Sequence, residues 1–73
     1  EHFRYMQRLL AEGRLFAGGP FVGDDGGMAV IRATSIEEAR EILAEDPAIT
    51  AGKMVATVRH WRPMLQGTQP LAE

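Results

Sequence analysis

Apolar side chains near the start of the chain recur at the spacing that places them on one face of a helix. Phe3, Met6, Leu9 and Leu10 follow this period, and Gly13 is a common helix-ending residue. The pattern predicts a helix over residues 1–12, with these four side chains turned toward the core.

A second helical pattern begins at a capping box formed by Ser35 and Glu38, in which the hydroxyl caps the helix and the carboxylate reaches back. The predicted helix ends at Asp46, because the residue before a proline such as Pro47 avoids helical geometry. Its buried stripe consists of Ile36, Ala39, Ile42 and Leu43.

Three other segments have the composition of short strands. Residues 15–17 are predicted to form the first, ended by Gly18-Gly19-Pro20. A glycine and aspartate turn at 23–27 leads to a second strand over 28–33. Residues 53–61 are predicted to form a third strand.

The resulting order is α-β-β-α-β, within a domain of residues 1–65 followed by a tail of residues 66–73. One more strand before residue 1 would give βαββαβ, the ferredoxin-like α+β arrangement with an antiparallel sheet. The fold class is therefore predicted to be ferredoxin-like, with its first strand missing from these 73 residues.

The last predicted strand is apolar on both faces, since Met54, Ala56 and Val58 alternate with Val55 and Trp61. A sheet with two apolar faces needs cover on both, and two helices cover only one. We therefore expect a second copy of the chain to pack sheet against sheet, forming a homodimer.

Composition narrows the possible functions. The chain has no cysteine, which removes disulfides and thiolate chemistry, and its net charge of −2 lacks the basic surface typical of nucleic-acid binding. No apolar run is long enough for a membrane span and no signal-peptide pattern is present. The default expectation is a cytoplasmic protein that binds neither nucleic acid nor membrane.

Chain direction through the predicted fold brings the start of the first helix, the end of the first visible strand and the end of the second helix to one end. These points carry His2, Gly19, Pro20 and Asp46, so a His–Asp pair and a ligand approaching the glycines are both possible there. Each residue also has a simpler interpretation: a surface histidine, a strand terminator, or an Asx turn before proline.

Other polar candidates have weaker support. Asp24 and Asp25 are typical of a solvated turn, and His60 is predicted to be a packing residue on the last strand. Phe16 and Trp61 are predicted to be core or dimer contacts. No spacing of metal ligands and no phosphate-binding or cofactor motif is present.

Two ordered stretches carry a family pattern, HFRYMQRLLAEGRLFAGGP and GGMAVIRATSIEEAREILAEDPAITAGKMVATVRHWRPM. Together they resemble the YciI-like (YCII-related) family over nearly the whole chain. The resemblance implies a dimeric α+β barrel and a catalytic His–Asp pair, here His2 and Asp46. One family member is a dehydrochlorinase acting on a chlorinated hydroxyhydroquinone, whereas most have no assigned reaction.

The leading functional hypothesis is a small, cofactor-independent enzyme of the lyase or isomerase type. It would transfer protons through His2 and Asp46 on a small, for example phenolic, substrate held near Gly19 and Pro20. The alternatives are a non-catalytic ligand-binding or regulatory dimer that uses the same cleft, and a domain that serves oligomerisation alone.

Overall fold

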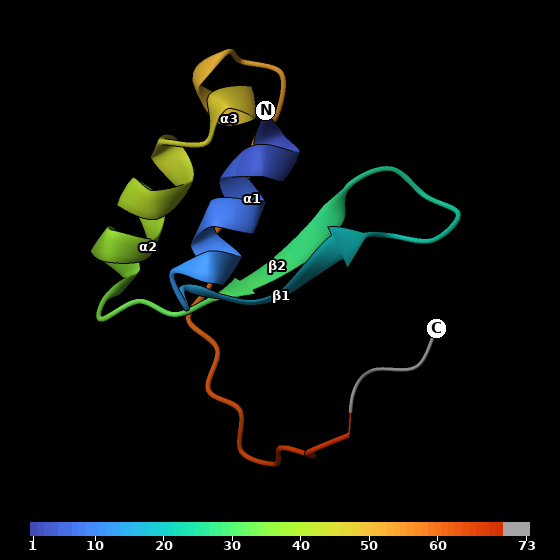
Figure 1. Ribbon diagram of the computed structural model, residues 1–73, viewed down its shortest axis with the longest axis vertical. Coiled ribbons are helices and arrows are strands. Elements are labelled where there is room, and N and C mark those ends of the chain that lie inside the picture. Colours follow the sequence, from blue (N-terminus) through green and yellow to red (C-terminus); the bar gives the residue numbers. More distant parts are fainter. Residues whose placement is uncertain (70–73) are drawn as a thin grey trace.

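The computed structural model describes residues 1–69 as a small α+β domain in which three helices stand beside a two-stranded sheet (Figure 1). Residues 70–73 of the predicted tail lie outside the described part. The elements in chain order are α1 (His2–Ala11), β1 (Leu15–Pro20), β2 (Gly27–Ile31), α2 (Ile36–Ala44) and α3 (Pro47–Thr50).

Both predicted helices form within a residue or two of their expected bounds. The capping box opens α2, because the Ser35 hydroxyl accepts a hydrogen bond from the Glu38 amide at 3.0 Å. Its reciprocal bond reaches one residue further back than expected, since the Thr34 amide donates to Glu38 Oε1 at 2.7 Å. The sequence did not reveal α3, which follows α2 after a two-residue break.

The strands β1 and β2 form an antiparallel hairpin whose register pairs Leu15 with Ile31 and Gly19 with Met28. The prediction that Gly18-Gly19-Pro20 ends the first strand is wrong, because all three residues lie within β1. The strands approach closely at their far end, where a side chain on Gly27 would lie 2.5 Å from the Gly19 carbonyl oxygen. Glycine is needed there to permit the pairing.

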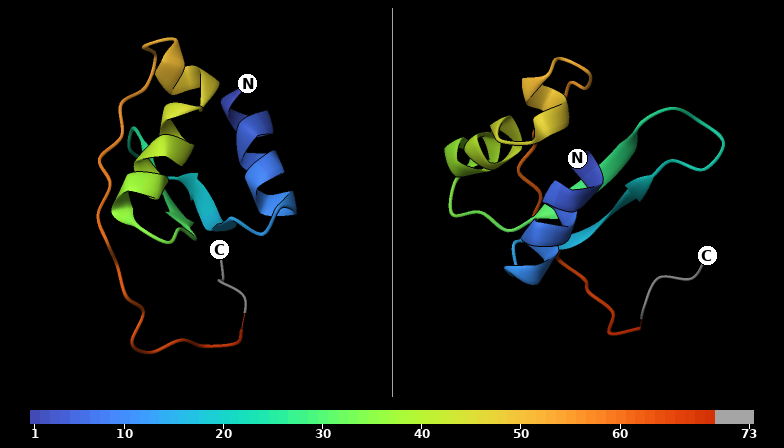
Figure 2. Two further views of the ribbon diagram at one scale, coloured as in Figure 1. Left: turned by 90° about the vertical axis from the view of Figure 1, so that its left-hand side faces the viewer. Right: turned by 45° about the horizontal axis from the view of Figure 1, so that its top comes forward.

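The predicted strand over residues 53–61 is also wrong: the structure gives this stretch no strand and, within residues 1–69, no sheet partner. The reason is non-local. A strand requires a neighbour for its backbone groups, and the last strand of a ferredoxin-like sheet pairs with the first. The described residues contain no strand before α1. The stretch therefore runs from α3 past α2 as a separate length of chain (Figures 1 and 2).

The core lies where α1 and α2 meet the base of the hairpin. Tyr5, Leu9 and Ile42 are buried there, and Leu15 and Ile31 pack against them from the two strands, joined by Met6. The expected orientation of α1 is only partly correct. Phe3 and Leu10, predicted to face the core, are 72% and 58% exposed, so the buried face is rotated toward Tyr5.

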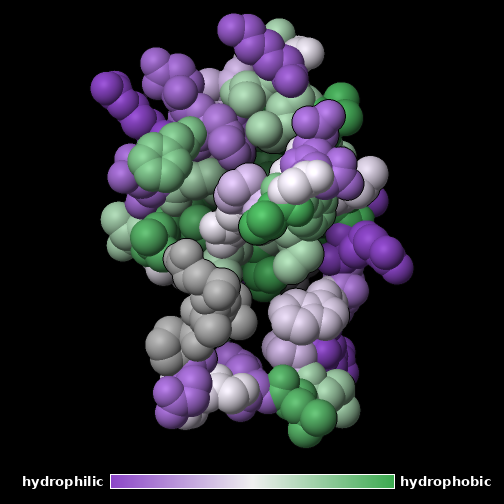
Figure 3. Space-filling model, turned by 90° about the vertical axis from the view of Figure 1, so that its right-hand side faces the viewer, coloured by the Kyte–Doolittle hydropathy of each residue, from purple (hydrophilic) through white to green (hydrophobic). Residues whose placement is uncertain are grey.

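Large apolar side chains remain on the surface outside this core, and Figure 3 shows several apolar patches between polar ones on the hairpin side. In the described residues they include Phe16 and Met28 of the hairpin and Val55 and Trp61 of the extended stretch. Phe16 and Trp61 are thus not core residues in the single chain. No helix among residues 1–69 has the length and apolar character of a membrane span.

Candidate functional site

The site is centred on a direct contact between residues 44 positions apart. His2 Nδ1 lies 2.5 Å from Asp46 Oδ2. His2 is the first residue of α1, and Asp46 stands between α2 and α3, so the ends of three helices meet at this pair. Figure 1 shows the N-terminus beside α3. The structure therefore brings together the two residues that chain direction predicted to share one end of the domain.

Asp46 is held by a second bond that fixes its carboxylate. Its Oδ1 atom accepts the Ala48 amide at 2.9 Å, which makes Asp46 the N-cap of α3, with Pro47 at the first helical position. One oxygen is therefore used by the local backbone and the other by His2. The sequence carries a signal for α3 that was not used. Asp46-Pro47 is a typical start of a helix, and Gly52, which has φ +73° in the structure, is a typical residue just after its end.

The burial of Asp46 makes this pairing a physical requirement. The residue has no exposed surface, and a buried carboxylate needs hydrogen bonds or an opposite charge. Its position at the end of α2 opposes that helix dipole, as the sequence indicated. The beginnings of α1 and α3 compensate, because helix N-termini favour negative charge. Asp46 thus combines the structural role of a cap with contact to the histidine.

The geometry also determines which histidine nitrogen remains available. A carboxylate oxygen only accepts hydrogen bonds, so Nδ1 of His2 carries the proton that it shares with Asp46. Nε2 is then the nitrogen that is not used by Asp46. The His2 side chain is 40% exposed while that of Asp46 is fully buried. The pair is therefore anchored on one side and accessible on the other.

Tyr5 is a residue of the site that sequence reasoning missed. Its hydroxyl donates to the Ile42 carbonyl oxygen at 2.5 Å, one helical turn away from the His2–Asp46 contact. Burial, followed by the nearby Glu45 carboxylate, raises the pKa of Tyr5 above its ordinary value of 10.0. The available signal was its position three residues after His2 and four before Leu9, on one helical face.

The comparisons with known proteins identify the family of the chain. The YCII-related domain family matches residues 1–62 of the chain. The chain belongs to the YCII-related family. A relative described as uncharacterized protein YjpA, from Bacillus subtilis (strain 168), is 43% identical over 61 residues. The alignment covers 84% of this chain and 72% of YjpA. No solved structure matches the chain.

Membership confirms the predicted family, and YjpA, an uncharacterized protein, has no reaction to compare. Catalytic roles for His2 and Asp46 therefore stay predictions. The same applies to Gly19 and Pro20 as substrate-binding residues. What the structure adds is their placement: all four residues line one broad cavity.

That cavity of the YCII-related domain has a volume of about 1380 Å³. Its walls come from α1, the hairpin, α2 and the extended stretch. Apolar side chains that line this cavity together with His2 include Phe3, Met6, Phe21 and Met28. His60 is exposed on the extended stretch and also lines this cavity, so its predicted role as a packing residue on a strand is wrong.

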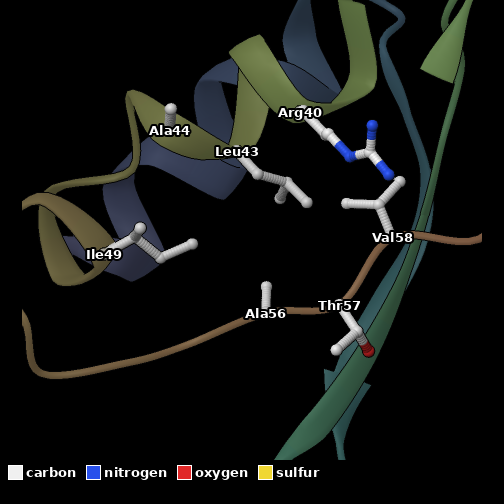
Figure 4. A pocket seen from close by; sticks show the side chains of 7 residues that line it. All are labelled: Arg40, Leu43, Ala44, Ile49, Ala56, Thr57 and Val58. Carbon is white, nitrogen blue, oxygen red and sulfur yellow. The ribbon is translucent and has the colours of Figure 1, made fainter. Parts of the chain in front are cut away.

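A smaller hollow lies between α2, α3 and the extended stretch and contains neither member of the His–Asp pair. Its volume is about 460 Å³. Leu43 and Ile49 point into it, and the side chain of Arg40 extends beside Val58 (Figure 4). This hollow separates the extended stretch from the helices that would cover it in a complete sheet.

The remaining polar candidates are not brought to the site. Asp24 and Asp25 lie in the exposed hairpin turn, where the Asp25 amide donates to Asp24 Oδ1 at 2.8 Å. This is the solvated turn that their composition indicated. Among residues 1–69, no cluster of three histidine, cysteine, aspartate or glutamate side chains could hold a metal ion.

Proposed function

We propose that this YCII-related protein is a small enzyme that transfers protons, with His2 as the exchanging group and Asp46 as its partner. The observation that carries the proposal is the 2.5 Å contact between His2 Nδ1 and the buried Asp46 carboxylate. A histidine oriented by a buried carboxylate is a recurrent acid–base arrangement in enzymes. Asp46 would select the Nδ1–H tautomer and leave Nε2 to exchange a proton with substrate.

The chemistry divides between the two side chains. His2 Nε2 would remove a proton from the substrate, and the imidazolium so formed would be stabilised by the Asp46 carboxylate on its other side. The α3 cap keeps the second Asp46 oxygen in place, so the carboxylate does not have to reorganise during transfer. Positioned acid–base groups of this kind contribute roughly 10²–10⁴-fold in rate.

The surroundings favour a small, predominantly apolar substrate. Phe3, Met6 and Phe21 line the cavity with His2, and aromatic or phenolic molecules suit such walls. Gly19 and Pro20 belong to the same lining and would bound the substrate without a long side chain. Removal of a proton from such a molecule begins either of two reactions. In a lyase reaction a leaving group then departs with its bonding electrons, as chloride does in the dehydrochlorination known for one family member, and in an isomerisation the proton returns from the imidazolium to another carbon.

The size of the cavity supports a more complete assembly as part of the proposal. Pockets for small ligands usually measure about 300–1,000 Å³. The space around His2 is larger, at about 1380 Å³, and both β2 and residues 54–61 line it. We propose that a further strand preceding α1 lies between them, giving the βαββαβ sheet, and that a second copy covers the sheet as a dimeric barrel.

Proton exchange at carbon provides a test that requires no known substrate. A panel of small phenols and cyclic ketones is incubated with the protein in D₂O, and deuterium incorporation is followed by NMR. We expect accelerated exchange for at least one compound, with a loss of roughly 10²-fold or more in His2→Gln and in Asp46→Asn. His60→Gln is the matched control, because His60 is the second histidine and is not bonded to Asp46.

Two outcomes would reject the proposed proton transfer through His2. If His2→Gln exchanges protons as fast as the unaltered protein, His2 is not the exchanging group. If compounds bind near His2, as shown by shifts of its ring signals, but none exchanges, the non-catalytic ligand-binding interpretation is favoured. Retained activity in His60→Gln supports the proposal only if His2→Gln and Asp46→Asn both lose activity.

A further inference from the structure

The end of α2 leaves one backbone carbonyl poorly satisfied within the helix. If α2 continued, the Ile42 carbonyl would accept a bond from the Asp46 amide. That amide instead donates to the Leu43 carbonyl at 3.0 Å, and Ile42 keeps only a long 3.4 Å bond from the Glu45 amide. Carbonyls at a helix end need an outside partner when they are buried.

Tyr5 supplies that partner from α1. Its hydroxyl donates to the Ile42 carbonyl, and only 7% of the residue is exposed. Tyr5 lies one turn after His2 on α1, and Ile42 lies one turn before Asp46. The Tyr5–Ile42 and His2–Asp46 bonds are therefore two successive connections across the same helix contact. The Arg8 guanidinium, 5.1 Å from the ring centroid, further restrains the tyrosine.

We infer that Tyr5 is a positioning residue, which sets the distance and orientation at which His2 meets Asp46. The two bonds have different tasks. The Tyr5 bond fixes the position of α1 along its axis relative to the end of α2. At that position the His2 side chain can reach the Asp46 carboxylate. A phenylalanine would fill the same space but would leave the Ile42 carbonyl without its strong donor. The raised pKa of Tyr5 keeps the hydroxyl protonated, and hence a donor, throughout the neutral range.

The test compares Tyr5→Phe with Thr50→Val, measured on the complete chain. Thr50 is a matched control because its hydroxyl donates to the Ala44 carbonyl at 3.1 Å, at the same helix end but without a link to α1. The measurement is the ¹⁵N spectrum of the His2 ring, which separates the Nδ1–H from the Nε2–H tautomer. We expect Tyr5→Phe to lower the ratio of Nδ1–H to Nε2–H by about a factor of two to ten. Thr50→Val should leave it unchanged.

A second measurement avoids the risk that Tyr5→Phe does not fold. Tyr5 is the single tyrosine, so its ionisation is followed without ambiguity by phenolate absorbance during an alkaline titration. Ionisation removes the donor to Ile42. We therefore expect the His2 ring signals of the unaltered protein to change with the same midpoint as the phenolate absorbance, before the far-ultraviolet circular dichroism changes.

The inference is overturned if Tyr5→Phe keeps the tautomer ratio of the unaltered protein, or if the His2 signals do not respond to Tyr5 ionisation. Equal changes in Tyr5→Phe and Thr50→Val would also overturn it, because they would reflect loosening of the helix end alone. The inference concerns the pair on which the proposed function depends, but its test needs no turnover. A Tyr5-dependent tautomer without proton exchange would support positioning and reject catalysis.

Discussion

Two regions of the domain are built from similarly apolar sequence and end in opposite states. At the junction of α1, α2 and α3, Tyr5, Leu9 and Asp46 are buried, and the polar side-chain atoms of Tyr5 and Asp46 all have hydrogen-bond partners. Along residues 54–61, apolar side chains alternate as they would in a strand, yet Val55 is 93% exposed. The structure of residues 1–69 gives that stretch no sheet partner.

The difference shows which contacts a sequence of this length can complete by itself. At the junction, the donors and acceptors lie on elements that the chain already contains, so packing two helices together satisfies them. The stretch over 54–61 has side chains suitable for a sheet, but a strand's backbone groups require a neighbouring strand. Apolar alternation therefore indicates where a strand can form and does not provide its partner.

The largest effect is expected at Leu9, which has no exposed surface, compared with its chain neighbour Leu10. Leu9→Ala removes the centre of the junction and should cost about 2–5 kcal/mol of unfolding free energy. Leu10→Ala removes the same atoms from a 58% exposed position on the same helix and should cost about 0.5 kcal/mol or less. Urea unfolding with an unchanged m-value measures both.

Equal losses for the two leucines would contradict the description of the junction as the core. A variant Leu9→Ala that does not fold, next to a folded Leu10→Ala, preserves the ordering. Leu10→Ala with the larger loss would show that the exposed face of α1 is covered in solution, and would move the principal contact of α1 to that face.

Hydrogen exchange tests the other region. In dilute solution, the amides of residues 54–61 should exchange fast, whereas those inside α1 and α2 should be protected by their helical bonds. If a second copy covers the sheet as proposed, protection of residues 54–61 should rise with protein concentration while that of α1 stays constant. Sedimentation of the same samples measures the association.

Two results would change the comparison between the regions. Protection of residues 54–61 that is already high and does not depend on concentration would show that this stretch is paired within one chain. Association without any new protection would place the dimer contact on another surface, such as the exposed Phe16 and Met28 of the hairpin.

The elements that could be predicted from the sequence are those with local causes. The start of α2 follows from Ser35 and Glu38, which act within one turn of chain. The proximity of His2 and Asp46 could be predicted by following chain direction, because each helix or strand carries the chain from one end of the domain to the other. The helix α3 was missed although Asp46, Pro47 and Gly52 mark its bounds, since the proline was interpreted only as a stop.

The errors share a dependence on partners that no local pattern contains. The strand predicted at 53–61 needed a neighbour, and its absence from residues 1–69 leaves an extended stretch. Phe3 and Leu10 fit the helical period of α1, but the position of α2 places Tyr5 in the core instead. The role of Tyr5 was also hidden, because its acceptor is a carbonyl that becomes available only where α2 ends.

The smallest effect, a change in the pH dependence of Tm, is expected at the start of α2. This helix end lies in the same helical region as the junction but is held by local bonds alone. The Thr34 backbone amide, and then its hydroxyl, donate to Glu38 and lower the pKa of Glu38 below its ordinary value of 4.5. A group whose pKa is lower in the folded state than in the unfolded state stabilises the fold at pH values above its unfolded-state pKa. This stabilisation is lost as the pH falls through its folded-state pKa. The Tm of Glu38→Gln should therefore fall less than that of the unaltered protein as the pH is lowered, because the titrating carboxylate is gone. Glu37→Gln, which removes a first-turn charge that has no bond to Thr34, should keep the fall of the unaltered protein. Coinciding profiles of Tm against pH for Glu38→Gln and Glu37→Gln would show that the reach-back bond adds nothing beyond the helix dipole.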